Sequence, residues 1–305
     1  MSHSYLKSII ALLLLSVSIT SCVNDSSVSP ISNTVERTSF SLYSVRDYGV
    51  SPETGELRVS FYESERIYSV PAASKNFESM LSRISASKDQ HLPIQISVQP
   101  NNELNDAIEA TPEEINTFKQ RFIEEPEVRD QYQMVIGSME ELSSIFKWIQ
   151  EQNCADGNAK IDFCIPFQYK IDGCYARAHK MREILQQRYG YGCNKIFSHG
   201  GIWHSLAVNN GDCCVYWGWH DAPVVKVNTD NGVVQMVIDP SLFDHAVTLA
   251  EWLTVQDDAT CDPNAKVASY QIVPGSYYFE DGTQDNDYHQ TNMILKLYRD
   301  LQTCN

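Results

Sequence analysis

The sequence predicts an α+β protein built from two units of different texture. Hydrophobic residues make up 43% of its 305 residues and charged residues 20%, which is the composition of a globular chain with a sizeable core. Residues 39 to 130 mix segments of strand and helix periodicity. A second mixture, richer in cysteine, glycine and aromatic residues, begins near Met134.

The N-terminal unit carries its expected elements in order. Alternating apolar and polar residues predict strands at 57–62 and 94–98, and helical spacing predicts helices at 76–84 and 113–122. Thr111, followed by a proline and two glutamates, is a good helix start. Threonine caps free N–H groups, and acidic residues suit the positive end of the helix dipole.

A linker is expected between the two units. The segment 124–130 is charged and interrupted by Pro126, which is typical of a linker. We therefore place a boundary there, with the N-terminal unit at residues 39–130 and the C-terminal unit at residues 131–305.

The first residues resemble an export signal. Lys7 precedes an apolar run, 9–15, that is too short for a membrane-spanning helix, which needs about 20 apolar residues. The run is followed by small residues and Cys22, similar to the lipobox of bacterial lipoproteins, whose cysteine is acylated. We interpret residues 1–22 as a lipoprotein signal peptide with Cys22 as the lipid anchor, and residues 23–38 as a flexible tether. An ordinary secretory signal is the alternative.

The charge of the chain limits its partners. Its formal net charge is −16, with 23 Lys and Arg residues against 39 Asp and Glu residues. This is the wrong sign for binding a phosphate backbone, so no nucleic-acid partner is expected, and neutral or basic partners are favoured. No other stretch reaches transmembrane length, so we expect a monomeric body attached to the membrane by the lipid anchor only.

The C-terminal unit is expected to begin with a helix. Residues 138–150 place four large apolar side chains on one face. Strands are predicted at 163–169, 224–227 and 233–238. The last two flank an Asn- and Gly-containing segment, 228–232, which predicts a hairpin turn.

Eight cysteines remain beyond Cys22, and export would place them where disulfides persist. Four bridges is the simplest expectation, although the sequence leaves the pairing open and the neighbours Cys213 and Cys214 rarely bond to each other. If one cysteine is a working thiol, at least one more has to lie outside a disulfide. No pair has the spacing of a zinc finger.

The segment 171–185 predicts a helix that begins near Cys174. Asp172 and Gly173 form a turn before it. A cysteine in the first turn of a helix lies at the positive end of the dipole, where free N–H groups stabilise a thiolate and an oxyanion. Cys174 is therefore a candidate nucleophile, and a disulfide partner or a buried thiol is the alternative.

A cysteine nucleophile needs a base and a residue that orients the base. His179 lies on another face of the same helix, so we expect it at the helix surface or in a supporting role. His204 and His220 each open an apolar run that could be a strand, and periodicity does not separate them. Asp239 ends another apolar run, where it could accept a hydrogen bond from an imidazole Nδ1–H. A plain Asp-Pro turn is the alternative for Asp239.

Three motifs, taken in order, resemble those of bacterial protein-glutaminases. They are Cys-Tyr-Ala-Arg-Ala-His-Lys-Met-Arg at 174–182, Cys-Cys at 213–214 with Trp-Gly-Trp-His-Asp-Ala-Pro-Val-Val at 217–225, and Ile-Asp-Pro-Ser-Leu-Phe at 238–243. The resemblance implies Cys174 as nucleophile, His220 rather than His204 as base, and Asp239 as the third member. It also implies a cysteine-hydrolase core of the transglutaminase-like or papain-like type, with the nucleophile at a helix N-terminus packed on an antiparallel sheet.

The resemblance extends upstream of the nucleophile. Residues 59–118 are similar to the inhibitory pro-region of these enzymes. This implies that residues 39–130 form an inhibitory α+β pro-domain and residues 131–305 the catalytic domain. Cys154 and Cys164 match a cysteine pair of the family.

The implied reaction is hydrolytic deamidation of glutamine side chains in proteins or peptides, through a thioester and with release of ammonia. It needs neither a metal nor an organic cofactor. The implied partners are glutamine-containing substrates and a protease that activates the zymogen at the cell surface or in the periplasm, with release after cleavage as an option. Three alternatives stay open: a transglutaminase, a cysteine protease, and a non-catalytic surface lipoprotein that binds peptides or glycans.

Overall fold

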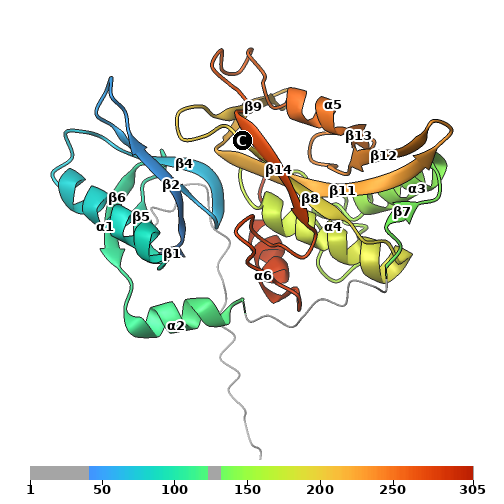
Figure 1. The fold of residues 1–305 in the computed structure, drawn as a ribbon, viewed down its shortest axis with the longest axis horizontal. Coiled ribbons are helices and arrows are strands. Elements are labelled where there is room, and N and C mark those ends of the chain that lie inside the picture. The colour runs from blue at the N-terminus through green and yellow to red at the C-terminus, as the bar shows by residue number, and fades with distance from the viewer. Residues whose placement is uncertain (1–40, 123–131, 305) are drawn as a thin grey trace, which may run out of the picture. The chain divides into compact units, whose positions relative to one another are not determined.

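The N-terminal part of the chain forms two small antiparallel sheets. The computed structural model describes residues 41–122 and 132–304 (Figure 1), so the expected signal peptide with Cys22, the tether and the linker lie outside the described residues. The strands are β1 (Ser41–Tyr43), β2 (Val45–Val50), β3 (Leu57–Phe61), β4 (Ser64–Val70), β5 (Ile94–Val98) and β6 (Leu104–Glu109). They pair in the orders β1-β5-β6 and β2-β3-β4. The predicted strands at 57–62 and 94–98 are confirmed as β3 and β5.

Two helices complete this part. Helix α1 (Phe77–Gln90) buries Met80 in the core that the strands share. Helix α2 (Pro112–Gln120) begins with a capping box, because the Thr111 hydroxyl accepts from the N–H of Glu114 and the Glu114 carboxylate accepts from the N–H of Thr111. The helix start predicted at Thr111 is confirmed.

A six-stranded sheet carries the C-terminal part (Figure 1). Its strands are β7 (Val135–Ile136), β8 (Asn194–His199), β11 (Trp219–Thr229), β12 (Gly232–Val237), β13 (Val247–Thr248) and β14 (Ser269–Pro274). Five of them pair antiparallel in the order β13-β12-β11-β8-β14, and β7 pairs parallel with β11. Strands β9 (Leu206–Asn209) and β10 (Cys214–Trp217) form a separate antiparallel pair. The predicted hairpin is confirmed as β11 and β12, although β11 begins earlier than expected.

Helices pack against this sheet and against one another. Helix α4 (Cys174–Tyr189) contacts β11, and α6 (His289–Tyr298) contacts α4. The predicted first helix is α3 (Met139–Gln150), which follows its N-cap Ser138, and α5 (Leu249–Thr254) is short. All four predicted apolar residues of α3 are buried, namely Leu142, Ile145, Phe146 and Ile149. The expectation of a helix that begins at Cys174 on an antiparallel sheet is confirmed.

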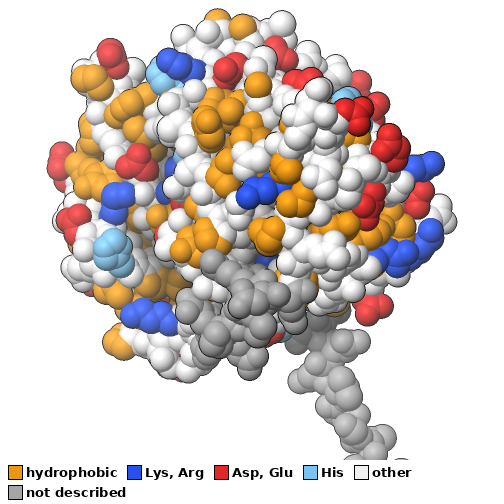
Figure 2. Space-filling model, turned by 45° about the vertical axis from the view of Figure 1, so that its right-hand side comes forward, with side chains coloured by type: hydrophobic (Ala, Val, Ile, Leu, Met, Phe, Trp, Pro, Cys, Tyr) orange, Lys and Arg blue, Asp and Glu red, His pale blue; other side chains and the backbone are white. Residues whose placement is uncertain are grey.

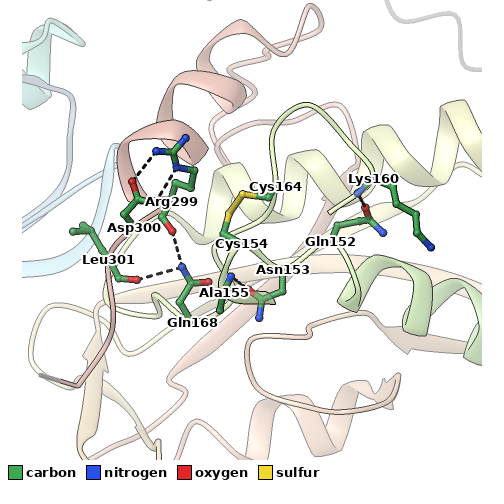
Figure 3. Close-up of a disulfide and its surroundings, with 10 residues drawn as sticks. All are labelled: Gln152, Asn153, Cys154, Ala155, Lys160, Cys164, Gln168, Arg299, Asp300 and Leu301. Carbon is green, nitrogen blue, oxygen red and sulfur yellow. Dashed lines mark hydrogen bonds and ion pairs between the residues drawn. A yellow bond between two sulfur atoms is a disulfide. The ribbon is translucent and has the colours of Figure 1, made fainter. Parts of the chain in front are cut away.

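The predicted strand at 163–169 is wrong. Only an isolated bridge between Asn153 and Ile165 forms there, beside the 3-10 turn at Cys154–Asp156. Ile165, Phe167 and Tyr169 are buried without a neighbouring strand while Phe163 is exposed, and other bonds hold the chain (Figure 3). These are the Cys154–Cys164 disulfide and the bonds from the Gln168 amide to the carbonyls of Arg299 and Leu301, at 2.8 and 3.3 Å.

Three disulfides form among the described residues. They are Cys154–Cys164, Cys213–Cys304 and Cys214–Cys261. Cys174 and Cys193 are buried and form no disulfide. The four-bridge expectation is therefore wrong, because one of the eight cysteines stands at the start of α4 as a thiol and a second is left outside the bridges with it. The pair Cys154 and Cys164 is confirmed.

The surface is mixed in character. Figure 2 shows acidic side chains scattered over one face, with apolar patches and a few basic side chains between them. The described residues belong to one compact unit, Glu36–Asn305. Among these residues, no helix combines the length and the apolar character that crossing a bilayer requires.

Candidate active site

Cys174 is the first residue of α4. Gly173, directly before it, has a φ of +86°, and a Cβ there would lie 2.7 Å from the Tyr298 ring, so this turn requires glycine. The first N–H groups of a helix have no partner inside the helix. The N–H of Cys174 therefore stays available to an oxygen in the site, beside a thiol whose residue is only 1% exposed.

The sheet brings His220 and Asp239 together. Strands β11 and β12 pair with Val224 opposite Val237, so the start of β11 and the residues after β12 meet at one edge. There, Nε2 of His220 lies 2.9 Å from Oδ2 of Asp239. The expected contact through Nδ1 is wrong, because the nitrogen remote from the main chain is the one that reaches across to the end of β12.

Two tryptophans hold the imidazole ring. Trp217 stacks on His220 with 4.7 Å between ring centroids, and Trp252 stacks with 5.5 Å. The indole N–H of Trp252 also donates to Oδ2 of Asp239 at 2.9 Å, and the N–H of Ser241 donates to Oδ1 at 3.1 Å. The imidazole of His220 and the carboxylate of Asp239 are therefore held in position by neighbouring side chains and backbone.

A glutamate from β4 fills the site. Glu65 is fully buried, and its Oε1 accepts a short hydrogen bond from the N–H of Cys174. Its Oε2 lies 3.3 Å from Nδ1 of His220. Sequence reasoning missed Glu65, because a single acidic residue in a strand 109 positions away carries no local sign of its contact with Cys174.

A buried arginine faces the same carboxylate. Nη1 of Arg177 donates to the carbonyls of Tyr169 and Asp172, each at 2.7 Å. Its Nη2 forms no hydrogen bond and lies 3.7 Å from Oε1 of Glu65. The positive charge of Arg177 is therefore directed at the oxygen that the N–H of Cys174 binds.

The charges shift the pKa values of the site in opposite directions. Burial, and then the carboxylates of Glu65 and Asp221, raise the pKa of the Cys174 thiol well above its ordinary value. Burial alone would lower the pKa of His220, but hydrogen bonds to Asp239 and Glu65 outweigh burial and raise it to about 9. Burial would raise the pKa of Asp239, but the hydrogen bond with His220 lowers it. With Glu65 in place, the imidazole is protonated and the thiol is neutral at neutral pH.

The other histidine candidates lie elsewhere. His179 is fully buried, with Nε2 3.0 Å from the carbonyl oxygen of Asp285, and burial lowers its pKa well below the ordinary value. The expectation of a helix-surface position for His179 is therefore wrong, because Tyr278, Asp285 and Tyr288 of the segment before α6 pack on it. His204 lies in the turn before β9, whereas His220 lies in β11 beside Asp239.

One group of side chains has the composition of a metal site. Ligand atoms of Glu65, Cys174 and His220 all lie within 4.8 Å of one another. Thiolate, imidazole and carboxylate are ligands that suit zinc. The same closeness is what a thiol and a base need for proton transfer.

Known proteins are similar to this chain. A family model described as glutaminase matches residues 142–256, which include Cys174, His220 and Asp239. No match is found among curated proteins.

Solved structures match over most of the chain. The crystal structure of a pro-protein-glutaminase is 30% identical, with a TM-score of 0.75, and covers 87% of this chain and 94% of that chain. A mutant of pro-protein-glutaminase is 31% identical over the same shares, with a TM-score of 0.76. The NMR structure of protein-glutaminase from Chryseobacterium proteolyticum is 36% identical, with a TM-score of 0.51, and covers 56% of this chain and 92% of that chain.

Proposed function

The chain belongs to the protein-glutaminase family, and on this basis we propose that Cys174, His220 and Asp239 hydrolyse the side-chain amide of protein-bound glutamine. The products are glutamate and ammonia. The family match supports the reaction, and the closeness of thiol, imidazole and carboxylate supports the roles of the three residues.

The position of the Glu65 carboxylate is the observation that carries this proposal. A glutamate side chain is the product of glutamine deamidation. Its Oε1 is bound by the N–H of Cys174 and faces Arg177, where a carbonyl oxygen would become an oxyanion. Its Oε2 faces Nδ1 of His220, where the leaving nitrogen or the attacking water would lie. The side chain of Glu65 therefore occupies the position proposed for the glutamate product.

The reaction follows from these positions. The Cys174 thiolate attacks the amide carbon, and the negative charge that develops on oxygen is stabilised by the N–H of Cys174 and by Arg177. Protonated His220 gives the proton on Nδ1 to the leaving nitrogen, so ammonia departs and a thioester remains. His220 then takes a proton from water, which attacks the thioester and releases glutamate. Asp239 holds the ring through Nε2 and stabilises its positive charge.

The N-terminal part acts as an inhibitory pro-region. Glu65 occupies the reaction centre, and the indole N–H of Trp219 donates to the carbonyls of Phe61 and Ser64 at 3.1 and 3.0 Å. The hydroxyl of Tyr175 donates to the carbonyl of Glu63 at 3.1 Å. These bonds hold the turn between β3 and β4 against the residues of the proposed site, and on this proposal a protease has to cut the chain before a substrate binds. The expected boundary near residue 130 is part of this proposal.

Ammonia release tests the function. A site for a specific protease is placed within 124–130, and the chain is incubated with a glutamine-containing protein before cleavage, and again after cleavage and removal of the N-terminal fragment. We expect ammonia and a mass gain of about 1 Da per converted glutamine after cleavage only, since the hydroxyl of water replaces an amide nitrogen. The Cys174→Ala variant serves as control, and a cleaved, folded enzyme that releases no ammonia contradicts the proposal.

The same incubation separates the alternatives. A transglutaminase would join an added lysine amine to the substrate, and a cysteine protease would produce new N-termini. Binding of peptides or glycans by the Cys174→Ala variant, beside an inactive wild type, would indicate a non-catalytic protein.

We also propose export as a monomeric lipoprotein, held at the cell surface or periplasmic side by Cys22. The lipobox-like sequence before Cys22 and the disulfides of the C-terminal part support this. A Cys22→Ala variant should lose incorporated fatty acid and leave the membrane fraction, and gel filtration of the soluble body reports its oligomeric state.

A further inference from the structure

One carboxylate next to the reaction centre binds three consecutive residues of the pro-region. Asp172 stands two positions before Cys174 and is 5% exposed. Its Oδ2 accepts from the hydroxyl of Ser64 at 2.9 Å, and its Oδ1 lies 3.3 Å from the N–H of Glu65. Arg66 follows in the chain, with Nε 3.8 Å from Oδ2. Asp172 therefore contacts both the backbone of the residue in the reaction centre and the side chain of the next residue.

The guanidinium of Arg66 has a second partner in the catalytic domain. Its Nη2 donates to the hydroxyl of Tyr169 at 3.1 Å, and the Arg66 side chain is 29% exposed. The ring of Tyr169 packs on that of Tyr298 with 4.9 Å between centroids, which fixes the position of the hydroxyl. Arginine is thus held by a buried acid and a phenol that both belong to the enzyme.

Removal of the pro-region changes what surrounds Asp172. The bonds from Ser64, Glu65 and Arg66 all leave with it, and the N–H of Gly173, at 2.9 Å from Oδ1, stays. The basic neighbour that remains, Arg177, binds the main-chain carbonyl of Asp172 rather than its carboxylate. The freed enzyme therefore presents a carboxylate that has lost its cation, directly beside the reaction centre.

We propose that Asp172 and Tyr169 form a substrate subsite that binds a basic side chain directly after the target glutamine. The inference rests on the proposed function, because it treats Glu65 as a mimic of the converted glutamine and Arg66 as a mimic of the substrate residue that follows it. The N–H of the glutamine itself would bind Oδ1 of Asp172, as that of Glu65 does. The enzyme then prefers Gln-Arg and Gln-Lys sequences in its substrate proteins.

Short peptides test this preference with the cleaved enzyme. A blocked alanine peptide with one central glutamine is made in four forms, with Arg, Ala or Glu after the glutamine, or with Arg before it. We expect kcat/KM for ammonia release to be about fivefold to tenfold higher with Arg after the glutamine than with Ala, and lowest with Glu, since a partly buried charged hydrogen bond has this strength. Equal rates for the peptides with Arg before and after the glutamine would overturn the proposal.

Variants assign the preference to the subsite. Asp172→Asn and Tyr169→Phe should each reduce the ratio of kcat/KM between the Arg and Ala peptides, Asp172→Asn to near one. Asp230→Asn removes the same charge in the exposed turn between β11 and β12, and its ratio should equal that of the wild type. If Asp172→Asn fails to fold, the Tyr169→Phe ratio decides, and an unchanged ratio in the folded variants overturns the subsite. Absence of ammonia from every peptide and protein would contradict the proposed function itself, whereas turnover without preference would contradict the subsite alone.

Discussion

The ammonium of Lys195 and the carboxylate of Asp221 form an ion pair with 3.3 Å between Nζ and Oδ2, and neither side chain has any exposure. Lys195 lies in β8 and Asp221 beside it in β11, where the carboxylate also raises the pKa of Cys174. Burial raises the pKa of Asp221 and lowers that of Lys195, and each charge opposes the shift of the other. The pair therefore offsets part of the negative charge of Asp221 near Cys174.

Replacement of Lys195 by Met should destabilise the protein strongly. It leaves Asp221 buried without its cation, and loss of one partner of a buried pair costs about 3 to 5 kcal/mol of the free energy of unfolding. Denaturant unfolding measures this cost. The double variant with Asp221→Asn should recover part of it, and a Lys195→Met protein as stable as wild type would show that the pair contributes little.

Glu65 gives a direct test of the geometry at the reaction centre. A Glu65→Gln substitution places a substrate amide where the product carboxylate lies, within reach of Cys174 and His220. We expect the uncleaved chain to attack its own residue 65. Loss of ammonia lowers the intact mass by about 17 Da in the thioester, and hydrolysis then gives a mass about 1 Da above that of the unreacted Glu65→Gln variant.

Mass spectrometry of the intact chain checks this outcome. The Glu65→Gln, Cys174→Ala double variant is the matched control, because it carries the same amide without the nucleophile. If residue 65 is still glutamine in both chains after prolonged incubation, the carboxylate of Glu65 does not lie where the substrate amide reacts.

The reactivity of Cys174 should report the removal of the pro-region. Burial and the Glu65 carboxylate raise the pKa of the thiol in the intact chain, and the Glu65 carboxylate leaves with the pro-region. We expect iodoacetamide to alkylate Cys174 at pH 7.5 at least about tenfold faster after cleavage and separation from the N-terminal fragment, because only the thiolate reacts. Peptide mapping gives the rate at each cysteine, and buried Cys193, whose surroundings are not removed, serves as the reference. Equal rates at Cys174 before and after cleavage would contradict the inhibitory role.

Local patterns in the sequence predicted several of the helices and strands but not the contacts that complete the site. The helix start at Cys174 follows from a turn and an apolar face within a dozen residues, so it could be read locally. Two contacts join residues that are distant in the chain, that of Glu65 with Cys174 and that of Lys195 with Asp221. Glu65, Lys195 and Asp221 are charged residues within strands, so no local pattern predicts their partners. Only the resemblance to a family favours His220 over His204, and only the folded structure shows that Nε2 is the nitrogen bound to Asp239.

The ion pair between Arg46 and Glu280 should help to hold the pro-region on the enzyme, in addition to the pair between Arg66 and Asp172. Nε of Arg46 in β2 lies 2.6 Å from Oε1 of Glu280, and its Nη2 lies 2.5 Å from Nδ1 of His199. Burial would raise the pKa of Glu280, but His199 and Arg46 outweigh it and lower this pKa to about 2. Glu280→Gln should therefore weaken retention of the cleaved pro-region by about tenfold, as expected for a charged, partly buried hydrogen bond.

Retention is measured as the dissociation constant of the N-terminal fragment after cleavage. Asp281→Asn is the matched control, because it removes the same charge from an exposed neighbour. Similar weakening by both variants would mean that overall charge, and not the pair with Arg46, holds the pro-region.

Because of the contact between Glu65 and His220, binding of the pro-region should weaken at alkaline pH. The hydrogen bonds to Asp239 and Glu65 raise the pKa of His220 from an ordinary 6.5 to about 9, so the docked pro-region favours the protonated ring. This stabilisation is fully present below the pKa of His220 in the free enzyme and is lost as the pH rises through about 9. We expect the cleaved fragment to stay bound at pH 7 and to dissociate increasingly above pH 9, measured by gel filtration at each pH. In a Glu65→Ala variant the binding should be weaker at pH 7 and should fall much less as the pH rises through about 9, and equal pH dependence in both chains would assign the effect to another group.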